Sequence, residues 1–483
     1  MKSKPDYFDK IRNRSLARWN MLENDPELAA PWWQLFNQIQ SPRHVISELL
    51  QNADDVLADQ ANIQVQDDVF LFQHNGKDFR EEDFESLCRF GYSNKRKLHT
   101  IGFRGIGFKS IFSLGERVEV FSPSLQVAFD KKRFTEPIWL NSDEVFNSLT
   151  TIRVRFDDKK IADLVKKILS SWIENPVSLL FFQNIKSLSL NGTVIRKKVI
   201  RKGPVKNSQW VSLISGNTSK EVLIIYSSPR GVSEEIQQEV KEERNDPEFS
   251  VPPLEISLVL GLERQQIYEV LPTNVELYLP FSINAPFIQD PARTGIKEPS
   301  KSPLNDWLLQ SAGELAASSF VEWLSNEKLS LDERAGAYDL LPDPQIPQNS
   351  GISAECSQQI VNAFAEFHSD QNVLLTSRGS LSNQQECLGL DADLLKVWNS
   401  EYLVSKFGSG HRFVLAEQVS VQTRTKLQQW NLLNRVPPRE ILKNLAKEEA
   451  PPNPGRESLK HLWNYVGGEL ESMGYFKKEI LKN

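Results

Sequence analysis

Gly102, Gly105 and Gly107 stand close together in the segment IGFRGIGFKS, which ends in Lys109 and Ser110. Glycine permits a positive φ and lets the backbone approach a bound group closely. The run FKSIFSL after Gly107 is expected to be a helix, whose free N-terminal amides attract phosphate. Phosphate binding is therefore the chemistry that these residues favour. A glycine-rich turn used only for packing is the alternative.

Two common phosphate-binding loops do not fit the order of these residues. The P-loop requires glycine directly before Lys-Ser, and Phe108 intervenes here. The dinucleotide-binding fingerprint reads GxGxxG, whereas this segment reads GxxGxG. The segment belongs to neither motif. It shares with them the close approach that glycines permit and the free amides expected at a helix N-terminus.

A polar helix face precedes the glycines by about 50 residues. In SPRHVISELLQNADDVL, Ser41 followed by Pro42 favours a helix start, because the hydroxyl can cap free amides and proline loses no hydrogen bond there. At about 100° per residue, Glu48, Asn52 and Asp55 fall within roughly 60° of one another, outside the apolar arc. Any amphipathic helix has a polar face, so this trio points to a site only together with the glycine segment.

The length and composition are those of a multidomain globular protein. At about 150 residues per domain, 483 residues predict about three units. A net charge of −6 gives no sign of nucleic-acid binding, and the three cysteines lack the spacing of a disulfide framework or a zinc site. The charged start of the chain lacks the apolar core of a signal peptide, and no apolar stretch reaches membrane-spanning length. We therefore expect a cytoplasmic protein.

Helical and alternating patterns are interleaved from 41 to 156, which predicts an α/β sandwich. Trp19, Trp32 and Trp33 lie at helical spacing within 6–40, which predicts one or two amphipathic helices that pack on this sandwich. Helices are expected at 41–57 and 80–90, and strands at 62–66, 69–73, 117–122, 125–130 and 150–156.

A second α/β unit is expected to follow. It comprises a helix at about 160–174, the strand-like runs IKSLSL, EVLIIYS, LEISLVLGL and VELYLPF, and a helix at 302–327. The prolines of LLPDPQIPQNSG at 340–351 forbid regular structure and predict a domain boundary. The predicted organisation is an N-terminal helical segment (1–40), a first α/β domain (41–165), a second (166–330), a linker (331–351) and a mixed, mainly helical C-terminal domain (352–483).

Together the motifs resemble those of the Bergerat-fold, or GHKL, ATPases, which include type II topoisomerases, ninety-kilodalton heat-shock chaperones, MutL proteins and microrchidia ATPases. The segments that carry the resemblance are ELLQNADD (48–55), HNGKDF (74–79), GYSNK (91–95), IGFRGIGFKS (101–110) and VEVFS with VAFD. The spelling GIGFKSIF, with HNG in place of an acidic box, looks most like the ATP-binding modules of sacsin and of plant NO VEIN-type proteins. The fold class implied is α+β, with a Bergerat sandwich of mixed sheet and helices at 41–165 followed by a transducer-like domain.

The resemblance implies a site for ATP and Mg²⁺ on the polar helix. Glu48 would be the general base that orients and deprotonates the attacking water, and Asn52 would hold the Mg²⁺ that bridges the phosphates. Residues i and i+4 share a helix face, so that base and metal ion can address one γ-phosphate. Asp55 would lie behind them, toward the base or the metal ion.

The same resemblance implies a lid whose amides and ammonium groups replace the hydration of the phosphates as it closes. Thr150, in TTIRV, lies where the family keeps a threonine near the adenine pocket. The predicted lid and phosphate-binding residues are Ser93, Lys95, Gly102, Arg104, Gly105, Ile106, Gly107, Phe108 and Lys109.

The box that normally reads DxGxG departs from the family and reads HNGKD, from His74 through Asn75 and Gly76. The family's aspartate accepts a proton from the adenine amino group. His74 takes its place, and a neutral imidazole accepts such a proton in only one tautomer, so Asn75 is the alternative acceptor. The choice between ATP and GTP stays open at this point. A turn residue with a surface ring is the other interpretation of His74.

Arg293 follows NAPFIQD in the predicted second domain. These ATPases complete their site with a lysine or arginine from outside the nucleotide domain, and position and charge make Arg293 the candidate for this second catalytic residue. A surface arginine is the alternative.

The function implied is a slow, Mg²⁺-dependent ATPase that couples lid closure to dimerisation or to domain rearrangement. The alternative is a scaffold that binds the nucleotide without hydrolysis and presents its C-terminal region to a partner. A histidine kinase is disfavoured, because no helix with a histidine beside Glu or Asp precedes the domain. The acidic net charge argues against autonomous DNA binding, although direct nucleic-acid binding stays open.

The expected partners are ATP and either a second copy of the chain or a larger complex, with no membrane. Sacsin-like modules occur in chaperone-like proteins and, in bacteria, beside nucleases in systems that look like phage defence or restriction. The resemblance favours the latter setting for this chain. The chain can also be one fragment of a longer protein.

Overall fold

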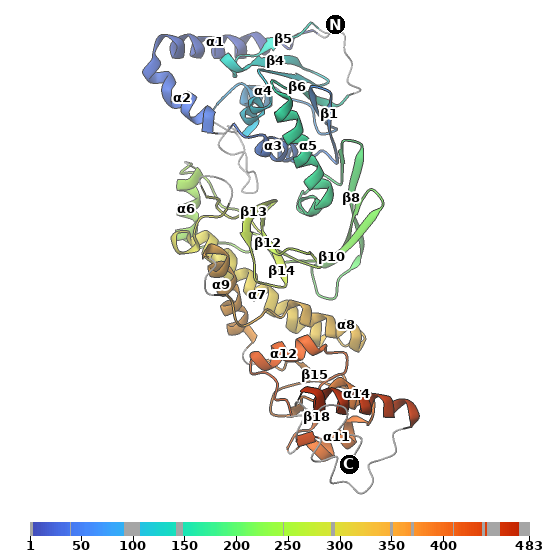
Figure 1. Ribbon diagram of the computed structural model, residues 1–483. Coiled ribbons are helices and arrows are strands. Elements are labelled where there is room, and N and C mark those ends of the chain that lie inside the picture. Colours follow the sequence, from blue (N-terminus) through green and yellow to red (C-terminus); the bar gives the residue numbers. More distant parts are fainter. Residues whose placement is uncertain are drawn as a thin grey trace.

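Helices and strands follow one another along an elongated molecule, from the N-terminal part at the top of Figure 1 to the C-terminal part at the bottom. Within the described residues, fourteen strands form one mixed sheet, which together with the helices gives an α+β fold. The computed structural model describes residues 3–38, 40–90, 107–141, 148–244, 246–290, 295–347, 351–368, 371–408, 410–436, 440–441 and 455–472.

The first part of the sheet is antiparallel and runs in the order β1-β2-β6-β3-β4-β5. Alternation places Phe70 and Phe72 on the inner face of β2, opposite Val154 and Ile152 of β6, because successive strand side chains point to opposite faces. The bounds are β1 Gln60–Gln66, β2 Val69–His74, β3 Arg117–Phe121, β4 Gln126–Asp130, β5 Ile138–Trp139 and β6 Thr150–Arg155.

The predicted polar helix is α3 (Pro42–Asp55). Its apolar arc is buried, with Ile46, Leu50 and Ala53 fully removed from solvent. α5 (Lys159–Glu174) packs beside it, and the two helices lie on the same side of the sheet (Figure 1). Ser41 stands at the N-cap as expected, but its side chain makes no capping hydrogen bond.

The C-terminal end of α3 is closed by a Schellman motif. The Ala58 amide donates to the Ala53 carbonyl at 3.0 Å, the Leu57 amide donates to the Asp54 carbonyl at 3.0 Å, and Leu57 takes a φ of 63°. The sharp turn leaves the Val56 carbonyl free to accept the Lys77 amide at 2.8 Å. The helix end is thereby fixed against the turn after β2.

The N-terminal helices α1 (Phe8–Asn24) and α2 (Pro26–Gln38) pack on an aromatic cluster. Of the one or two helices predicted within 6–40, the described residues contain two. Phe134 is the centre of the cluster, and its ring stacks on Phe36 at a centroid distance of 4.3 Å. Trp19 meets it edge-on and donates a hydrogen bond to the Thr135 hydroxyl at 2.8 Å. Aromatic pairs of this kind add to the free energy gained by burial.

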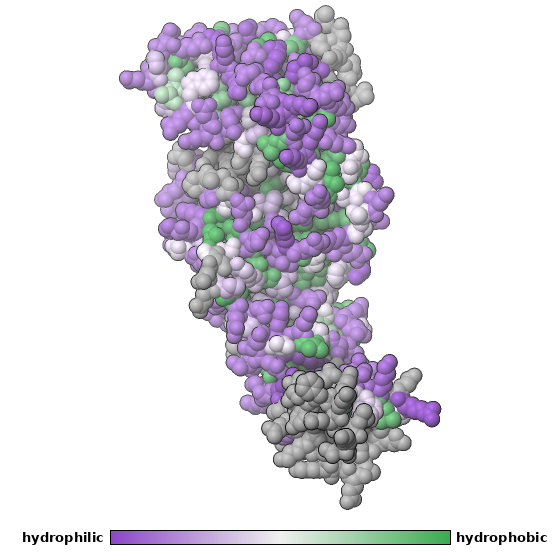
Figure 2. Space-filling view, viewed as in Figure 1, coloured by the Kyte–Doolittle hydropathy of each residue, from purple (hydrophilic) through white to green (hydrophobic). Residues whose placement is uncertain are grey.

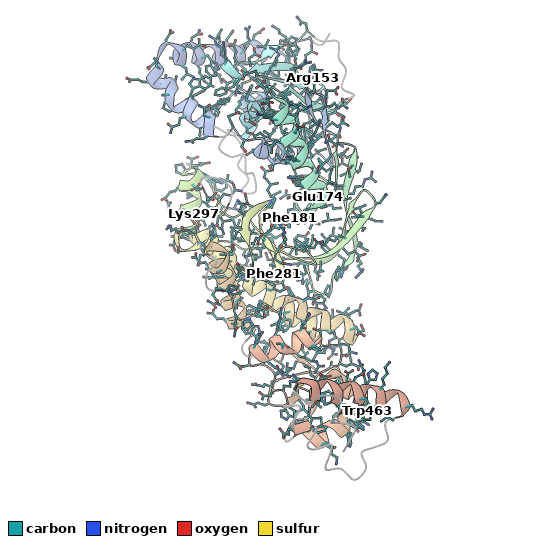
Figure 3. All side chains as sticks on the ribbon, viewed as in Figure 1. Arg153, Glu174, Phe181, Phe281, Lys297 and Trp463 are labelled. Carbon is teal, nitrogen blue, oxygen red and sulfur yellow. The ribbon has the colours of Figure 1, made fainter. Side chains whose placement is uncertain are left out.

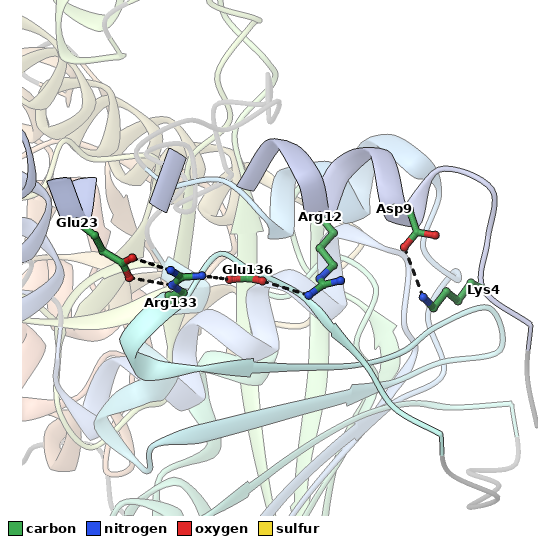
Figure 4. A network of polar contacts seen from close by, with 6 residues as sticks. All are labelled: Lys4, Asp9, Arg12, Glu23, Arg133 and Glu136. Atoms are coloured by element: carbon green, nitrogen blue, oxygen red, sulfur yellow. Dashed lines mark hydrogen bonds and ion pairs between the residues drawn. The ribbon is translucent and has the colours of Figure 1, made fainter. Parts of the chain in front are cut away.

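A polar network holds α1 against residues 133–136 from outside (Figure 4). Arg133 binds both carboxylate oxygens of Glu23, at 2.8 and 2.6 Å, and contacts Glu136 at 3.0 Å. Arg12 extends the chain to the other oxygen of Glu136 at 3.5 Å. The hydrogen bond from Arg133 is the main cause that lowers the pKa of the Glu23 carboxyl.

The sheet continues into the second part of the chain through parallel pairing of β1 with β7. The remaining strands follow in the order β7-β8-β9-β10-β11-β14-β12-β13. Their bounds are β7 Ser187–Leu190, β8 Thr193–Lys202, β9 Ser208–Ser215, β10 Thr218–Tyr226, β11 Ser257–Leu260, β12 Gln266–Glu269, β13 Leu271–Glu276 and β14 Phe281–Asn284.

Two differences from the sequence predictions occur in this second part. The run VELYLPF is not one strand, because β13 ends at Glu276 and β14 begins at Phe281. The hairpin of β8 and β9 was not expected, because most of β8 is exposed and basic and so lacks the apolar alternation of a half-buried strand.

The helices α6 (Glu234–Arg244) and α7 (Pro303–Ser325) belong to the second part. Phe181 lies between the first and second parts in Figure 3, and its ring contacts Tyr268 at a centroid distance of 4.8 Å. The 3-10 segments and shorter helix of both parts are α4 Glu81–Leu87, η2 Gly107–Ser113, η3 Lys131–Arg133, η4 Pro176–Leu180 and η5 Pro299–Lys301.

The proline-rich segment after 340 is irregular, as its composition predicts, and the C-terminal part holds it in place. Lys426 donates to the Leu341 carbonyl at 3.1 Å, and Trp430 donates to the Pro342 carbonyl at 2.9 Å. The division into domains at 165, 330 and 351 stays a prediction. The elements here are α8 Leu331–Ala335, η6 Gly336–Leu340, α9 Gly351–His368, β15 Leu374–Leu375, β16 Leu381–Ser382, β17 Cys387–Leu388, α10 Ala392–Leu395, α11 Ser400–Phe407, β18 Phe413–Val414, α12 Val421–Gln429 and α14 Arg456–Ser472.

The face of the molecule shown in Figure 2 is mainly hydrophilic, with apolar residues scattered over it. Among the helices that the structure describes, none combines the length and the apolar character needed to cross a bilayer.

Asp54 joins the polar helix to the second part of the chain. Its carboxylate accepts the backbone amides of Gln183, Asn184 and Ile185 at 2.9, 2.7 and 2.9 Å. These residues lead directly into β7, so a single carboxylate holds the end of α3 and the start of the second part together.

We predict that Asp54→Ala destabilises the protein by about 2 kcal/mol, because it leaves three amides without their charged acceptor. Thermal unfolding should then begin several degrees lower, by about 5 °C. Asp163→Ala, at an exposed aspartate of α5, is the matched control and should leave the transition within about 1 °C. Equal melting curves for the two variants would show that the clamp carries no stability.

Candidate functional site

Glu48 and Gly107 are in direct contact. η2 packs against α3, and the Glu48 side chain is buried, with only 5% of the residue exposed. A Cβ placed on Gly107 would lie 1.9 Å from Glu48 Oε2 and 2.4 Å from its Cδ. The carboxylate therefore occupies the space that a side chain at 107 would need, and glycine at this position is required by close approach.

The other polar residues of α3 differ in how far they are buried. Asn52 is half-buried and shares the face of Glu48, and Asp55 is exposed at the last turn. Gln51 is buried, and neither atom of its amide has a hydrogen-bond partner within the described part of the chain. Buried polar groups are nearly always paired, so Gln51, which the sequence did not single out, is a candidate for contact with a ligand. Its spacing of three from Glu48 was the available signal.

The turn after β2 lies against the end of α3. A Cβ on Gly76 would be 2.6 Å from Val56 Cγ2 and 2.9 Å from the Val56 carbonyl oxygen, so that this turn also requires glycine. Asn75 is exposed, and its side-chain oxygen accepts the backbone amides of Asp59 and Gln60 at 3.1 and 3.0 Å. The Asn75 side chain therefore closes the turn, and its oxygen is already used by these two hydrogen bonds.

His74 ends β2 with its ring inside. The residue is 8% exposed, and its Nδ1 accepts the Gly76 amide at 3.1 Å. Desolvation by burial lowers the pKa of His74 to about 4, so the ring is neutral at neutral pH. The interpretation as a turn residue with a surface ring is therefore wrong.

Thr150 pairs directly with His74 across β2 and β6. It is buried, with 2% of the residue exposed, and its hydroxyl has no hydrogen-bond partner among the described residues. The structure thus brings together two residues that the sequence predicted for base recognition, although they lie far apart in the chain.

Lys109 differs from its predicted role as a lid ammonium. Its side chain is buried, and its Nζ donates to the carbonyls of Leu87 and Phe134 at 2.7 and 2.8 Å. The ammonium also lies over the Phe129 ring, 4.7 Å from its centroid. Burial lowers the pKa of Lys109 to about 7. The Lys109 amino group is therefore bound within the core on which η2 packs.

The segment after Gly107 is helical as predicted, but it is a short 3-10 helix, Gly107–Ser113. Ser110 donates its hydroxyl to the Gly107 carbonyl at 2.7 Å, and Phe108 is half-buried, with its ring edge-on to Phe129. The other predicted residues lie outside the described residues: Ser93, Lys95, Gly102, Arg104, Gly105, Ile106 and Arg293.

The arrangement can hold one divalent ion beside a bound polyphosphate. Among the described residues, no group of three or more His, Cys, Asp or Glu side chains is placed to bind a metal ion alone. Mg²⁺ commonly takes one or two protein oxygens and completes its shell with phosphate oxygens and water. The amide oxygen of Asn52, one turn from Glu48, fits this requirement.

An alignment 407 positions long, which covers 75% of this chain, is 23% identical to Protein NO VEIN of Arabidopsis thaliana. The chain is a distant homologue of NO VEIN. This match confirms the resemblance to NO VEIN-type proteins that the motifs indicate. The matched region covers 14% of the length of NO VEIN.

No family model matches the chain. Among solved structures, the ATPase region of topoisomerase II from Saccharomyces cerevisiae is similar over 38% of this chain and 58% of that chain. The sequence identity is 12% and the TM-score is 0.25.

We predict that Gly107→Ala weakens nucleotide binding by at least about 10-fold, because the new methyl group must displace the Glu48 carboxylate. Gly231→Ala is the matched control, since a Cβ there meets no atom within 4 Å. Binding is measured by calorimetric titration of Mg²⁺ and a non-hydrolysable ATP analogue. Wild-type affinity in Gly107→Ala would contradict the close contact.

A second prediction concerns acid stability. The pKa of His74 is about 4 in the folded protein and about 6.5 when unfolded, so the unfolded state binds more protons between these values. Stability due to the neutral ring is complete above pH 6.5 and is lost as the pH falls toward 4, by up to about 3 kcal/mol. Denaturant unfolding at pH 7.5 and 5.0 should show a smaller acid loss in His74→Gln than in wild type. Equal losses would exclude a buried neutral ring.

Proposed function

We propose that the chain is an Mg²⁺-dependent, slowly ATP-hydrolysing switch protein whose first part is a Bergerat-type sandwich. The single observation that carries this proposal is the buried Glu48 carboxylate in contact with Gly107 of the glycine segment. It supports a common site for the two motifs that the sequence keeps about 50 residues apart. The distant homology to NO VEIN is consistent with this assignment.

Glu48 performs the proton transfer in this proposal. Its carboxylate accepts a proton from water as the water oxygen forms a bond to the γ-phosphorus. The bond between that phosphorus and the bridging oxygen of ADP breaks, and the electron pair stays with ADP. The products are ADP and phosphate, and the proton passes from Glu48 to solvent. A buried base beside a glycine backbone leaves little room for competing water.

Asn52 holds the metal ion through its amide oxygen, and Gln51 donates its unpartnered amide hydrogens to phosphate or to the attacking water. Bound Mg²⁺ supplies neutralisation of the phosphate charge. Asp55, exposed at the end of α3, lies outside this inner group and acts at longer range.

In this proposal, two contacts transmit closure of the lid to the rest of the chain. η2 carries Phe112, whose ring meets Phe134 in the cluster that supports α1 and α2. At the other end of α3, Asp54 holds the amides that lead into β7. A shift of α3 relative to η2 therefore reaches both the N-terminal helices and the second part. Dimerisation or domain rearrangement is the proposed output.

Arg293 completes the site from the second part in this proposal, as a cation that stabilises the phosphate charge of the transition state. Its position after NAPFIQD and its charge are the support. Arg293→Ala should lower turnover while ATP binding persists, and unchanged turnover would remove it from the mechanism.

The second candidate function is a nucleotide-sensing scaffold without hydrolysis. The contact between α3 and η2 supports this candidate equally, because nucleotide binding does not require hydrolysis. The two functions differ in only one respect, which is the role of the Glu48 carboxylate as a base.

We predict that Glu48→Gln lowers phosphate release by at least about 100-fold while it retains nucleotide binding, because the amide keeps the shape but cannot accept the proton. Phosphate release is measured under steady-state conditions with Mg²⁺ and ATP. Glu174→Gln, at a carboxylate on the last turn of α5, is the matched control and should match wild type. Equal release by wild type and Glu48→Gln would leave the scaffold as the function.

A further inference from the structure

We propose that the site recognises the edge of adenine by an inverted hydrogen bond, in which His74 Nε2–H donates to ring atom N1 and the Thr150 hydroxyl accepts from the 6-amino group. This inference rests on the proposed function and names the chemistry by which the same site selects its nucleotide. A carboxylate in the place of His74 would only accept hydrogen bonds and would read the amino group instead.

The tautomer of His74 follows from the turn after β2. Nδ1 accepts the Gly76 amide at 3.1 Å, and a ring nitrogen that accepts a hydrogen bond carries no proton. A neutral imidazole must then carry its proton on Nε2. The burial that lowers the pKa of His74 to about 4 keeps the ring in this neutral form at physiological pH.

The Gly76 amide is held in position by the end of α3. The next amide along the chain, that of Lys77, donates to the Val56 carbonyl at 2.8 Å, and Val56 packs so closely on Gly76 that a Cβ would clash. The turn therefore cannot rotate away to release Nδ1 without breaking contacts with the helix that carries Glu48. His74 is a fixed donor in this fold.

Thr150 supplies the second group. The inner face of β2 and β6 pairs Phe70 with Val154 and Phe72 with Ile152, and the next pair on the same face is His74 with Thr150. Directly opposite residues have Cβ atoms about 5 Å apart. The apolar ladder thus ends in two adjacent polar groups, a fixed donor and a hydroxyl that has no partner in the described part of the chain.

A buried hydroxyl without a partner calls for a ligand, because such a group otherwise carries a desolvation penalty. Asn75, the alternative base reader, is committed to the amides of Asp59 and Gln60. The pair of His74 and Thr150 therefore presents one donor beside one acceptor. Adenine presents the complementary pair in N1 and its 6-amino group, whereas guanine carries a proton on N1 and would set two donors against each other.

The test compares base analogues on the wild-type chain with Mg²⁺, through displacement of a fluorescent ATP analogue. The analogue 1-deaza-ATP lacks the N1 acceptor and should bind at least about 10-fold more weakly than ATP, because the buried Nε2–H is left unpaired. Purine riboside triphosphate keeps N1 and lacks the amino group, so it should lose less than 1-deaza-ATP. GTP should bind more weakly than ATP.

Each analogue has a matched variant. In His74→Phe, which keeps a ring but has no donor, ATP and 1-deaza-ATP should bind equally. In Thr150→Val, which keeps the shape but has no hydroxyl, ATP and purine riboside triphosphate should bind equally. The analogue series on wild type needs no variant, so a variant that does not fold leaves the comparison decisive.

The outcomes separate this inference from the proposed function. If ATP itself fails to displace the probe, the proposed function is wrong and base recognition fails with it. If ATP binds but 1-deaza-ATP binds equally well, or if GTP binds more tightly than ATP, the inverted hydrogen bond alone is overturned. A loss confined to purine riboside triphosphate would show that the amino group is read as in a carboxylate site.

Discussion

The approach of the Glu48 carboxylate to the backbone of Gly107 is the contact on which the site depends. A carboxylate can be buried without large cost only where its surroundings satisfy it, and a glycine leaves the space that it occupies. The contact joins a helix to a segment that no local sequence signal connects to it. Glu48 and the glycine backbone come to one place only because the first part of the sheet positions both elements.

The remainder of the first part holds this contact in register. The apolar arc of α3 packs on the sheet and α5, and its C-terminal end is fixed twice, by the turn at Gly76 and by the Asp54 carboxylate. The buried Lys109 side chain of η2 donates to the carbonyls of Leu87 and Phe134, and so connects η2 to the aromatic cluster. The site is thus built from elements that are each anchored independently of any ligand.

The sequence predicts the local elements of the site well, because periodicity reports burial directly. α3, β2, β6 and the two N-terminal helices follow from the positions of their apolar residues. The motifs single out Glu48, Asn52, His74 and Thr150 as candidates. Periodicity does not predict the pairing of β1 with β7 or the exposed hairpin of β8 and β9. Pairing between distant strands is decided by tertiary contacts.

The burial and the hydrogen-bond partners of individual polar side chains could also not be predicted from the sequence. A lysine after a glycine-rich segment looks like a phosphate ligand, yet Lys109 finds two carbonyls in the core. Asn75 looks like a base reader, yet it closes a turn. Gln51 was not among the predicted site residues, yet it is buried one helical turn from Glu48. For Lys109 and Asn75, the partners that decide the role are brought close by the fold and lie at least 15 residues away in the chain.

Hydrogen–deuterium exchange of the full chain, with and without saturating Mg²⁺ and a non-hydrolysable ATP analogue, tests the common site most directly. Exchange reports the opening of each backbone segment, so it shows where a ligand stabilises the chain. We expect slower exchange together in α3, in the turn at 74–77 and in η2. Unchanged exchange in both α3 and η2 at saturating nucleotide would contradict a nucleotide site between them.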